Sequence, residues 1–197
     1  DCLTMLNEVR KLLKLALPIF VAQFSLSSMS LVDTLMAGNY GKLDLAAVAV
    51  GGSIWLLAIL FTQAVLFSIT PLVSQALGRG DSQGAKNYLC QGVWLGVIIG
   101  LIVCTFVFSG LPALTLLDAN PEMLHVAGQY LVWIICGLPF AGAYQAMRGF
   151  VEGHTHTKAV MVINLVALLA NIPLNYIFIY GKLGAPAMGG VGCGVAS

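Results

Sequence analysis

Long uncharged stretches separated by short charged segments dominate this sequence. Runs of 18, 34, 31, 25 and 23 uncharged residues follow Lys14, Asp44, Lys86, Glu122 and Lys158. Segments such as "WLGVIIGLIVCTFVF" do not alternate polar and apolar residues, as the strands of a membrane barrel would. A helix that crosses a bilayer needs about 20 residues. The pattern therefore predicts five membrane-spanning helices, over residues 12–40, 45–77, 87–117, 123–147 and 159–181.

The tail after Lys182 is too short for another complete span. Its 15 residues contain the Gly- and Pro-rich segment "GAPAMGGVGCG", which predicts a loop that leads into a sixth helix from about residue 190. Composition agrees with a membrane protein, because 59% of the residues are hydrophobic and only 9% are charged, against about 25% charged in soluble domains. The predicted fold class is an all-α, polytopic transmembrane helix bundle.

The basic residues predict the orientation of this bundle. Seven of the nine Lys and Arg lie before the first span, between the second and third, or between the fourth and fifth; only Lys42 and Lys182 lie on the other side. Since basic residues favour the cytoplasmic side, we expect a cytoplasmic amino terminus in a multi-pass protein of the cell (inner) membrane. The net charge of +1 gives no indication of a nucleic-acid partner.

Asp33 is the one charged residue that lies well inside a predicted span, because every other charge, Lys14 included, lies outside the spans or within a turn or two of a span end. A carboxylate buried in a membrane is costly, so such residues usually face a cavity or a partner and mark functional sites. At 100° per residue, four polar residues of the same span share an arc of about 60° that Asp33 flanks. These candidate cavity-lining residues are Gln23, Ser27, Ser30 and Thr34.

A second polar face lies on the fifth predicted span. Asn164, Asn171 and Asn175 are spaced by seven and four residues, which places them on one side of a helix. With Asp33 they would supply hard oxygen ligands for a small cation such as Na⁺, or hold a proton on the carboxylate. The alternative is that the Ser, Thr and Asn side chains only bond neighbouring helices, as is common in membranes.

Other candidate motifs give weaker signals. The five cysteines show no CxxC spacing, and "EGHTHTK" offers two histidines without a third ligand, so we expect neither a disulfide framework nor a zinc site. Arg148 and Glu152, spaced i,i+4, predict a surface ion pair at a helix end. No cofactor is expected beyond a small cation or a proton at Asp33.

Five segments of the chain form a familiar set: "LALPIFVAQ", "VDTLMAG", "DLAAVAVG", "LVSQALGRGD" and "NIPLNYIFIYGKLGAPAMGGVGCGVA". They resemble the multidrug and toxic compound extrusion (MATE) family, in its NorM-like branch, and the resemblance runs from Leu12 to Ser197. It implies a fold of twelve helices in two six-helix lobes related by a pseudo-two-fold axis. Residues 1–197 would be the amino-terminal lobe, without the carboxyl-terminal lobe that is its expected partner.

The resemblance also implies a function and a site. Proteins of this family export organic, often cationic, drug-like compounds in exchange for Na⁺ or H⁺, so we expect a secondary active antiporter and not an enzyme. The family's coupling site falls on Asp33, Asn171 and Asn175, and a helix-6 hydroxyl falls on Ser197. Where some proton-linked members carry a second acid, this chain has Asn175, which favours Na⁺ or a mixture of Na⁺ and H⁺.

Three rival hypotheses follow from the same sequence. A lipid-linked precursor flippase of the same superfamily would need buried Arg or Lys for a pyrophosphate head group, and none is predicted within a span. An intramembrane aspartyl enzyme would need two aspartates, and only Asp33 is available. A half-transporter that pairs as a homodimer would have only five complete spans and part of a sixth in each protomer, which makes a poor protomer.

Overall fold

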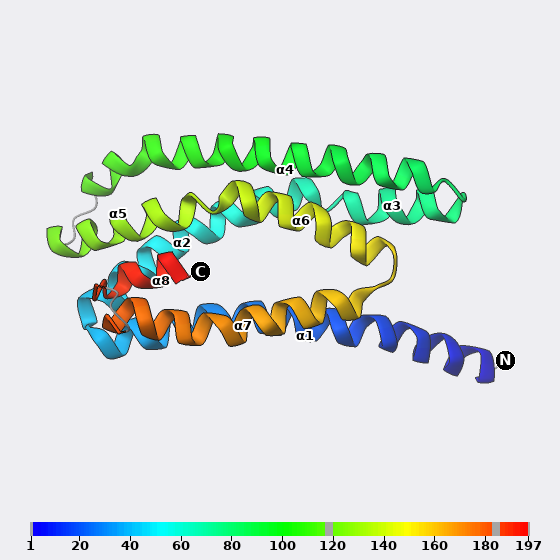
Figure 1. The fold of residues 1–197 in the computed structure, drawn as a ribbon, viewed down its shortest axis with the longest axis horizontal. Coiled ribbons are helices and arrows are strands. Elements are labelled where there is room, and N and C mark those ends of the chain that lie inside the picture. Colours follow the sequence, from blue (N-terminus) through cyan, green and yellow to red (C-terminus); the bar gives the residue numbers. More distant parts are fainter. Residues whose placement is uncertain (1, 117–119, 183–185, 197) are drawn as a thin grey trace.

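The computed structural model of the protein describes residues 2–116, 120–182 and 186–196 (Figure 1). Helices account for nearly all of these residues and no strand occurs among them, which confirms the all-α prediction. The helices are α1 (Cys2–Tyr40), α2 (Lys42–Leu66), α3 (Ile69–Gly78), α4 (Ser82–Gly110), the 3-10 helix η1 (Leu111–Leu116), α5 (Pro121–Ile135), α6 (Leu138–Gly153), α7 (Thr157–Tyr180) and α8 (Gly190–Ala196).

Four segments are long and apolar enough to cross a membrane, and a bent pair of helices makes a fifth. The four are Leu12–Tyr40, Lys42–Gly78, Ser82–Gly110 and Thr157–Tyr180, and the pair is α5 with α6. The third segment ends at Gly110, seven residues before the predicted limit at 117, because the chain tightens there into η1. The fourth predicted span, 123–147, is divided into two helices at an angle of 44°.

Two prolines explain where the helices break. Pro71 and Pro139 lack the N–H that would bond the carbonyl four residues earlier, and the chain leaves the α-helix just before each, at 67–68 and 136–137. Pro18 and Pro173, by contrast, lie inside the unbroken helices α1 and α7. A proline in a membrane helix is tolerated when neighbouring groups satisfy the freed carbonyl.

The helices form two groups that α8 joins at one end (Figure 1). In one group α1 and α7 run side by side in the same direction, and in the other α4 packs along α6 and α3. α8 lies between α5 and α7. The α3–α4 and α6–α7 connections, which have Arg79, Arg148 and Lys158 in or near them, lie at the same end of the bundle as the start of α1 (Figure 1).

The outside of this bundle is apolar and several of its buried residues are polar. Phe106, Phe140 and Leu57 expose 77%, 78% and 71% of their surface, while the buried residues include Asp33 and three asparagines. In water such an arrangement would be unfavourable, because apolar surface is driven out of contact with water. It suits a bundle whose exterior faces lipid.

Glycine allows α4 and α6 to approach each other closely. A Cβ atom on Gly96 would lie 2.5 Å from the carbonyl oxygen of Gly142, and a Cβ on Gly100 would lie 2.6 Å from Cα of Pro139. Both obstacles are backbone atoms that no side-chain rotation can move. Small residues serve this purpose in many membrane helix pairs.

The contact predicts opposite effects for two glycine-to-alanine substitutions. Gly96→Ala should destabilise the protein by about 1–3 kcal/mol, the usual cost of overpacking, because the added methyl group meets the backbone of α6. Gly52→Ala has no atom within 4 Å of the added Cβ and should stabilise α2 by about 0.5–1 kcal/mol. Unfolding of the purified protein in detergent measures both, and equal effects would contradict the close contact between α4 and α6.

Candidate functional site

The candidate site forms where α1 and α7 pack together. Asp33 is only 8% exposed, and its Oδ1 accepts a hydrogen bond of 2.5 Å from Nδ2 of Asn175. The same Nδ2 donates to Oδ1 of Asn171 over 2.9 Å. The structure therefore brings together the three residues that the sequence predicted as a cation or proton site.

Helix geometry explains why these residues meet. Asn171 and Asn175 are one turn apart on α7, so both side chains point to the same neighbour, and that neighbour is α1. Both asparagines are almost completely buried, at 1% and 0% exposed. The carboxylate thus accepts a hydrogen bond from a buried amide group of α7.

One polar atom of this cluster has no partner. Oδ1 of Asn175 is buried and accepts no hydrogen bond from any residue that the structure describes. A buried acceptor without a donor costs free energy, which a cation or a ligand donor would recover. Carboxylate and amide oxygens are also the ligands that hard cations prefer.

Two residues that the sequence did not single out complete the surroundings of Asp33. Tyr130 on α5 is 4% exposed and lies within electrostatic reach of the carboxylate. Cys193 on α8 is fully buried, and its thiol donates to the backbone oxygen of Asp33 over 3.6 Å. Nothing in the sequence marks either residue, because Tyr130 lies in an apolar run and Cys193 lies among glycines.

Glycines on two helices make room for the Tyr130 ring. A Cβ atom on Gly51 of α2 would lie 2.5 Å from Cδ1 of the ring, and a Cβ on Gly194 of α8 would lie 3.1 Å from Cδ2. The ring is therefore held in a slot between α2 and α8.

Asp44 fixes the position of α8. Its Oδ1 accepts a hydrogen bond of 2.6 Å from the backbone N–H of Gly190, the first residue of α8. The preceding Gly189 has φ of +56°, a conformation that glycine adopts without strain, and a Cβ there would lie 2.5 Å from the same carboxylate oxygen. This anchor positions Cys193 beside Asp33.

The predicted polar stripe of the first span does not join the site. Gln23, Ser27 and Ser30 are exposed, and the partly buried Thr34 donates its hydroxyl to the oxygen of Ser30 on its own helix. The stripe thus faces away from the packed interior of the described residues. Ser197, the predicted helix-6 hydroxyl, lies outside the described residues.

Asn164 belongs to a different cluster from Asp33. It is 3% exposed, and its Oδ1 accepts a hydrogen bond of 2.5 Å from the hydroxyl of Tyr144 on α6. One turn from Tyr144, Nε of Arg148 donates to Oε1 of Glu152 over 2.7 Å. The predicted ion pair therefore forms, but its side chains are only 9% and 17% exposed, so it is partly buried and not on the surface as expected. α6 packs against α7, and the i,i+4 spacing of two residues on one helix gives no information about such a contact with another helix.

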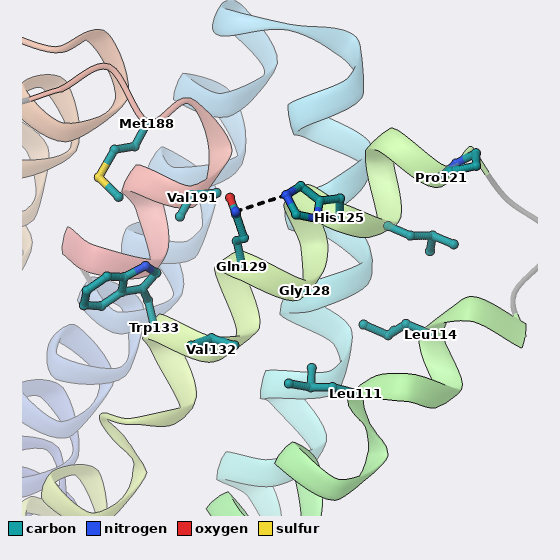
Figure 2. Close-up of a pocket in the computed structure, with 11 residues that line it drawn as sticks. Leu111, Leu114, Pro121, His125, Gly128, Gln129, Val132, Trp133, Met188 and Val191 are labelled. Atoms are coloured by element: carbon teal, nitrogen blue, oxygen red, sulfur yellow. Dashed lines mark hydrogen bonds between the residues drawn. The ribbon is translucent and has the colours of Figure 1, made fainter.

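A separate pocket of about 730 Å³ opens between α5, η1 and α8 (Figure 2). Its walls are mainly apolar, with Leu114 and Val191 among them, and its polar edge is the His125–Gln129 contact of 3.1 Å between Nε2 atoms. None of the predicted site residues that the structure describes lines it. Within the described parts of the chain, no three His, Cys, Asp or Glu side chains gather as metal ligands.

Comparison with known proteins agrees with this arrangement. The sequence matches the family described as MatE over residues 18–177. It is 44% identical over 191 residues to the multidrug resistance protein MdtK of Yersinia pestis (strain Pestoides F), covering 96% of this chain and 42% of the relative. The MdtK protein of Edwardsiella ictaluri (strain 93-146) is 43% identical over 192 residues, covering 97% of this chain and 42% of that protein.

Solved structures share the fold at lower identity. An outward-facing multidrug resistance MATE family transporter of the MOP superfamily superposes with a TM-score of 0.80 at 21% identity, covering 93% of this chain and 40% of that one. A MOP superfamily transporter from Pyrococcus furiosus gives 0.79 at 21% identity, with the same coverage. The chain spans about two fifths of the length of the curated relatives it matches. On the family match and the identity to MdtK, this chain belongs to the MatE family, the multidrug and toxic compound extrusion proteins.

Proposed function

We propose that the protein containing this chain is a secondary active multidrug efflux antiporter that exports organic, often cationic compounds in exchange for Na⁺ or H⁺. The observation that carries the proposal is the buried Asp33–Asn175–Asn171 cluster with its unpartnered acceptor on Asn175. An acid at membrane depth is a functional site by default. Support for multidrug export comes from the names of the MdtK relatives.

In this proposal Asp33 takes up the coupling ion and the two asparagines respond to it. Nδ2 of Asn175 donates to Oδ1 of Asp33 and to Oδ1 of Asn171 at once. Its two N–H groups therefore take the place that a cation bound to these two oxygens would occupy. Rotation of this amide would turn the unpartnered Oδ1 toward the same oxygens and complete an oxygen ligand set for Na⁺. A proton on Asp33 would instead neutralise the carboxylate directly.

Coupling requires that the ion binds two conformations with different affinity. The site touches α1, α7 and α8, and α8 is held through Asp44 and Cys193. Neutralising Asp33 changes the free energy of all these contacts. We propose that the resulting change in helix packing releases the exported compound on the outside, with the amino terminus in the cytoplasm of the cell (inner) membrane and a carboxyl-terminal lobe of the same protein as partner.

A lipid-linked precursor flippase is the second candidate. The flippase hypothesis needs a buried basic residue, and the side chain of Arg148 is only 9% exposed. Glu152 neutralises that arginine at 2.7 Å, which leaves no net positive charge for a pyrophosphate. Multidrug export therefore remains the better supported function.

Asp33→Asn should abolish gradient-driven export. Dye efflux is measured in membrane vesicles that contain the complete protein, with Na⁺ and H⁺ gradients imposed separately. Asp81→Asn is the matched control, because Asp81 is an exposed carboxylate that caps α4 through the N–H of Gly84, and Asn caps a helix equally well. We expect the control to retain efflux and the effective gradient to identify the ion. Unchanged efflux in the Asp33 variant would contradict the proposal.

Asn175→Leu should remove stabilisation by sodium. A ligand that binds only the folded state at a hundred times its Kd stabilises that state by about 2.7 kcal/mol, so the melting temperature of the parent should rise when NaCl replaces KCl. The variant lacks the amide and should show no such rise, whereas Ser53→Ala, which loses only a hydroxyl bonded to its own helix, should keep it. If NaCl and KCl act equally on the parent while acid stabilises it, the coupling ion is H⁺.

A further inference from the structure

A small cavity lies between α1 and the start of α7, far along the bundle from the Asp33 site. It has a volume of about 280 Å³, and it is lined by Lys14 and Leu15 of α1 and by residues 155–159 around the start of α7. The lining includes the basic residues Lys14 and Lys158, and none of the described residues that line it is an Asp or a Glu. The charge of this cavity therefore favours an anion.

The first turn of α7 offers backbone donors to such an anion. The first N–H groups of a helix have no acceptor within it, and His156, which precedes α7, provides no side-chain cap. Within the described parts of the chain, the N–H of Ala159 bonds the carbonyl of His156 over 3.0 Å, whereas the N–H groups of Thr157 and Lys158 have no acceptor. Free N–H groups and the helix dipole together attract anions to the start of a helix.

A buried hydroxyl at the same place points to a ligand. The buried hydroxyls of Ser25 and Thr62 donate to carbonyls one turn earlier on their own helices. Thr157 is 4% exposed, but it is the first residue of α7 and has no earlier turn, and its hydroxyl bonds no residue that the structure describes. The oxygen is not one of the enclosed polar atoms without a partner, so it opens on the cavity that Thr157 lines.

The cavity lies where the lipid-facing surface begins. The membrane-spanning segments of α1 and α7 both start at this end of the bundle, and the two helices run side by side (Figure 1). Leu17 shares a face of α1 with Lys14, and Val162 shares a face of α7 with Lys158. Both apolar side chains are exposed. A basic cavity is thus continuous with apolar surface that leads toward the middle of the bilayer.

We propose that this cavity binds the phosphate group of an anionic phospholipid. The hydroxyl of Thr157 and the free N–H groups donate to the phosphate oxygens, Lys14 and Lys158 balance the charge, and the acyl chains lie along the exposed apolar side chains. Basic pockets between membrane helices bind lipid head groups in this way. A free phosphate would meet the same donors but would leave the apolar surface unused. The bound lipid bridges α1 and α7, the helices that carry Asp33 and Asn175.

Three probes test the site on the purified complete protein in detergent. They are dioleoyl phosphatidylglycerol, dioleoyl phosphatidylcholine and inorganic phosphate, and native mass spectrometry measures the affinity for each. We expect phosphatidylglycerol to bind at least about fivefold more tightly than phosphatidylcholine, because the choline group offsets the charge of the phosphate that basic residues attract. Excess inorganic phosphate should not displace the bound phosphatidylglycerol.

Thr157→Val removes the hydroxyl and keeps the shape of the side chain. The variant should bind phosphatidylglycerol at least about tenfold more weakly, since hydrogen bonds to charged groups are among the stronger ones. Thr105→Val is the matched control, because the exposed Thr105 donates only to the carbonyl of Leu101 on its own helix. This control should leave the affinity unchanged.

Lys14→Gln tests the charge without touching the packed interior, since Lys14 is exposed. It should weaken phosphatidylglycerol about fivefold, the effect of one basic residue at an anionic membrane surface. Lys182→Gln makes the same change at an exposed position beyond the far end of α7 and should have no effect.

Three results would overturn the inference. The first is equal affinity for the two lipids, and the second is an unchanged affinity for phosphatidylglycerol in either Thr157→Val or Lys14→Gln. The third is displacement of the lipid by excess inorganic phosphate, which would assign the site to free phosphate. Since none of these measurements involves export, their outcome is independent of the proposed transport function.

Discussion

The hydrogen bond from Asn175 to Asp33 joins α7 to α1 inside the bundle, and a second one, from the hydroxyl of Tyr180 to the backbone oxygen of Met36 over 3.4 Å, joins the same two helices. A carboxylate inside a bilayer costs on the order of 2.5–3.5 kcal/mol on insertion scales. The amide of Asn175 offsets part of it, and it can do so only if α7 lies along α1. α8 packs against the paired helices α1 and α7. At this contact the thiol of Cys193 donates to the backbone oxygen of Asp33.

Close packing elsewhere in the bundle depends on residues that lack side chains or lack an N–H. Gly96 lets α4 touch the backbone of α6, and Gly51 opens the slot that holds the ring of Tyr130. Pro139 divides the fourth span into α5 and α6, which meet at 44°. The bend lets one span contact two sets of neighbours, with α5 against α2 and α8, and α6 against α4.

Unpartnered atoms distinguish the two polar clusters of α7 from ordinary helix contacts. A hydrogen bond that served only to join helices would leave no buried group unused, since each unused group costs free energy. Asn175 keeps an unused acceptor and Asn164 an unused donor.

Local patterns along the chain are enough to predict the class of fold and the central pair of asparagines in the site. Uncharged runs long enough to span a bilayer are local properties, and the 100° step of a helix places Asn171 and Asn175 on one face wherever the helix lies. The same step could not show which face of the first span meets α7, so Asp33 is buried while Gln23, Ser27 and Ser30 are exposed. Tertiary structure alone brought Tyr130 and Cys193 to Asp33 and covered the ion pair of Arg148, because these contacts join residues that are distant in the chain.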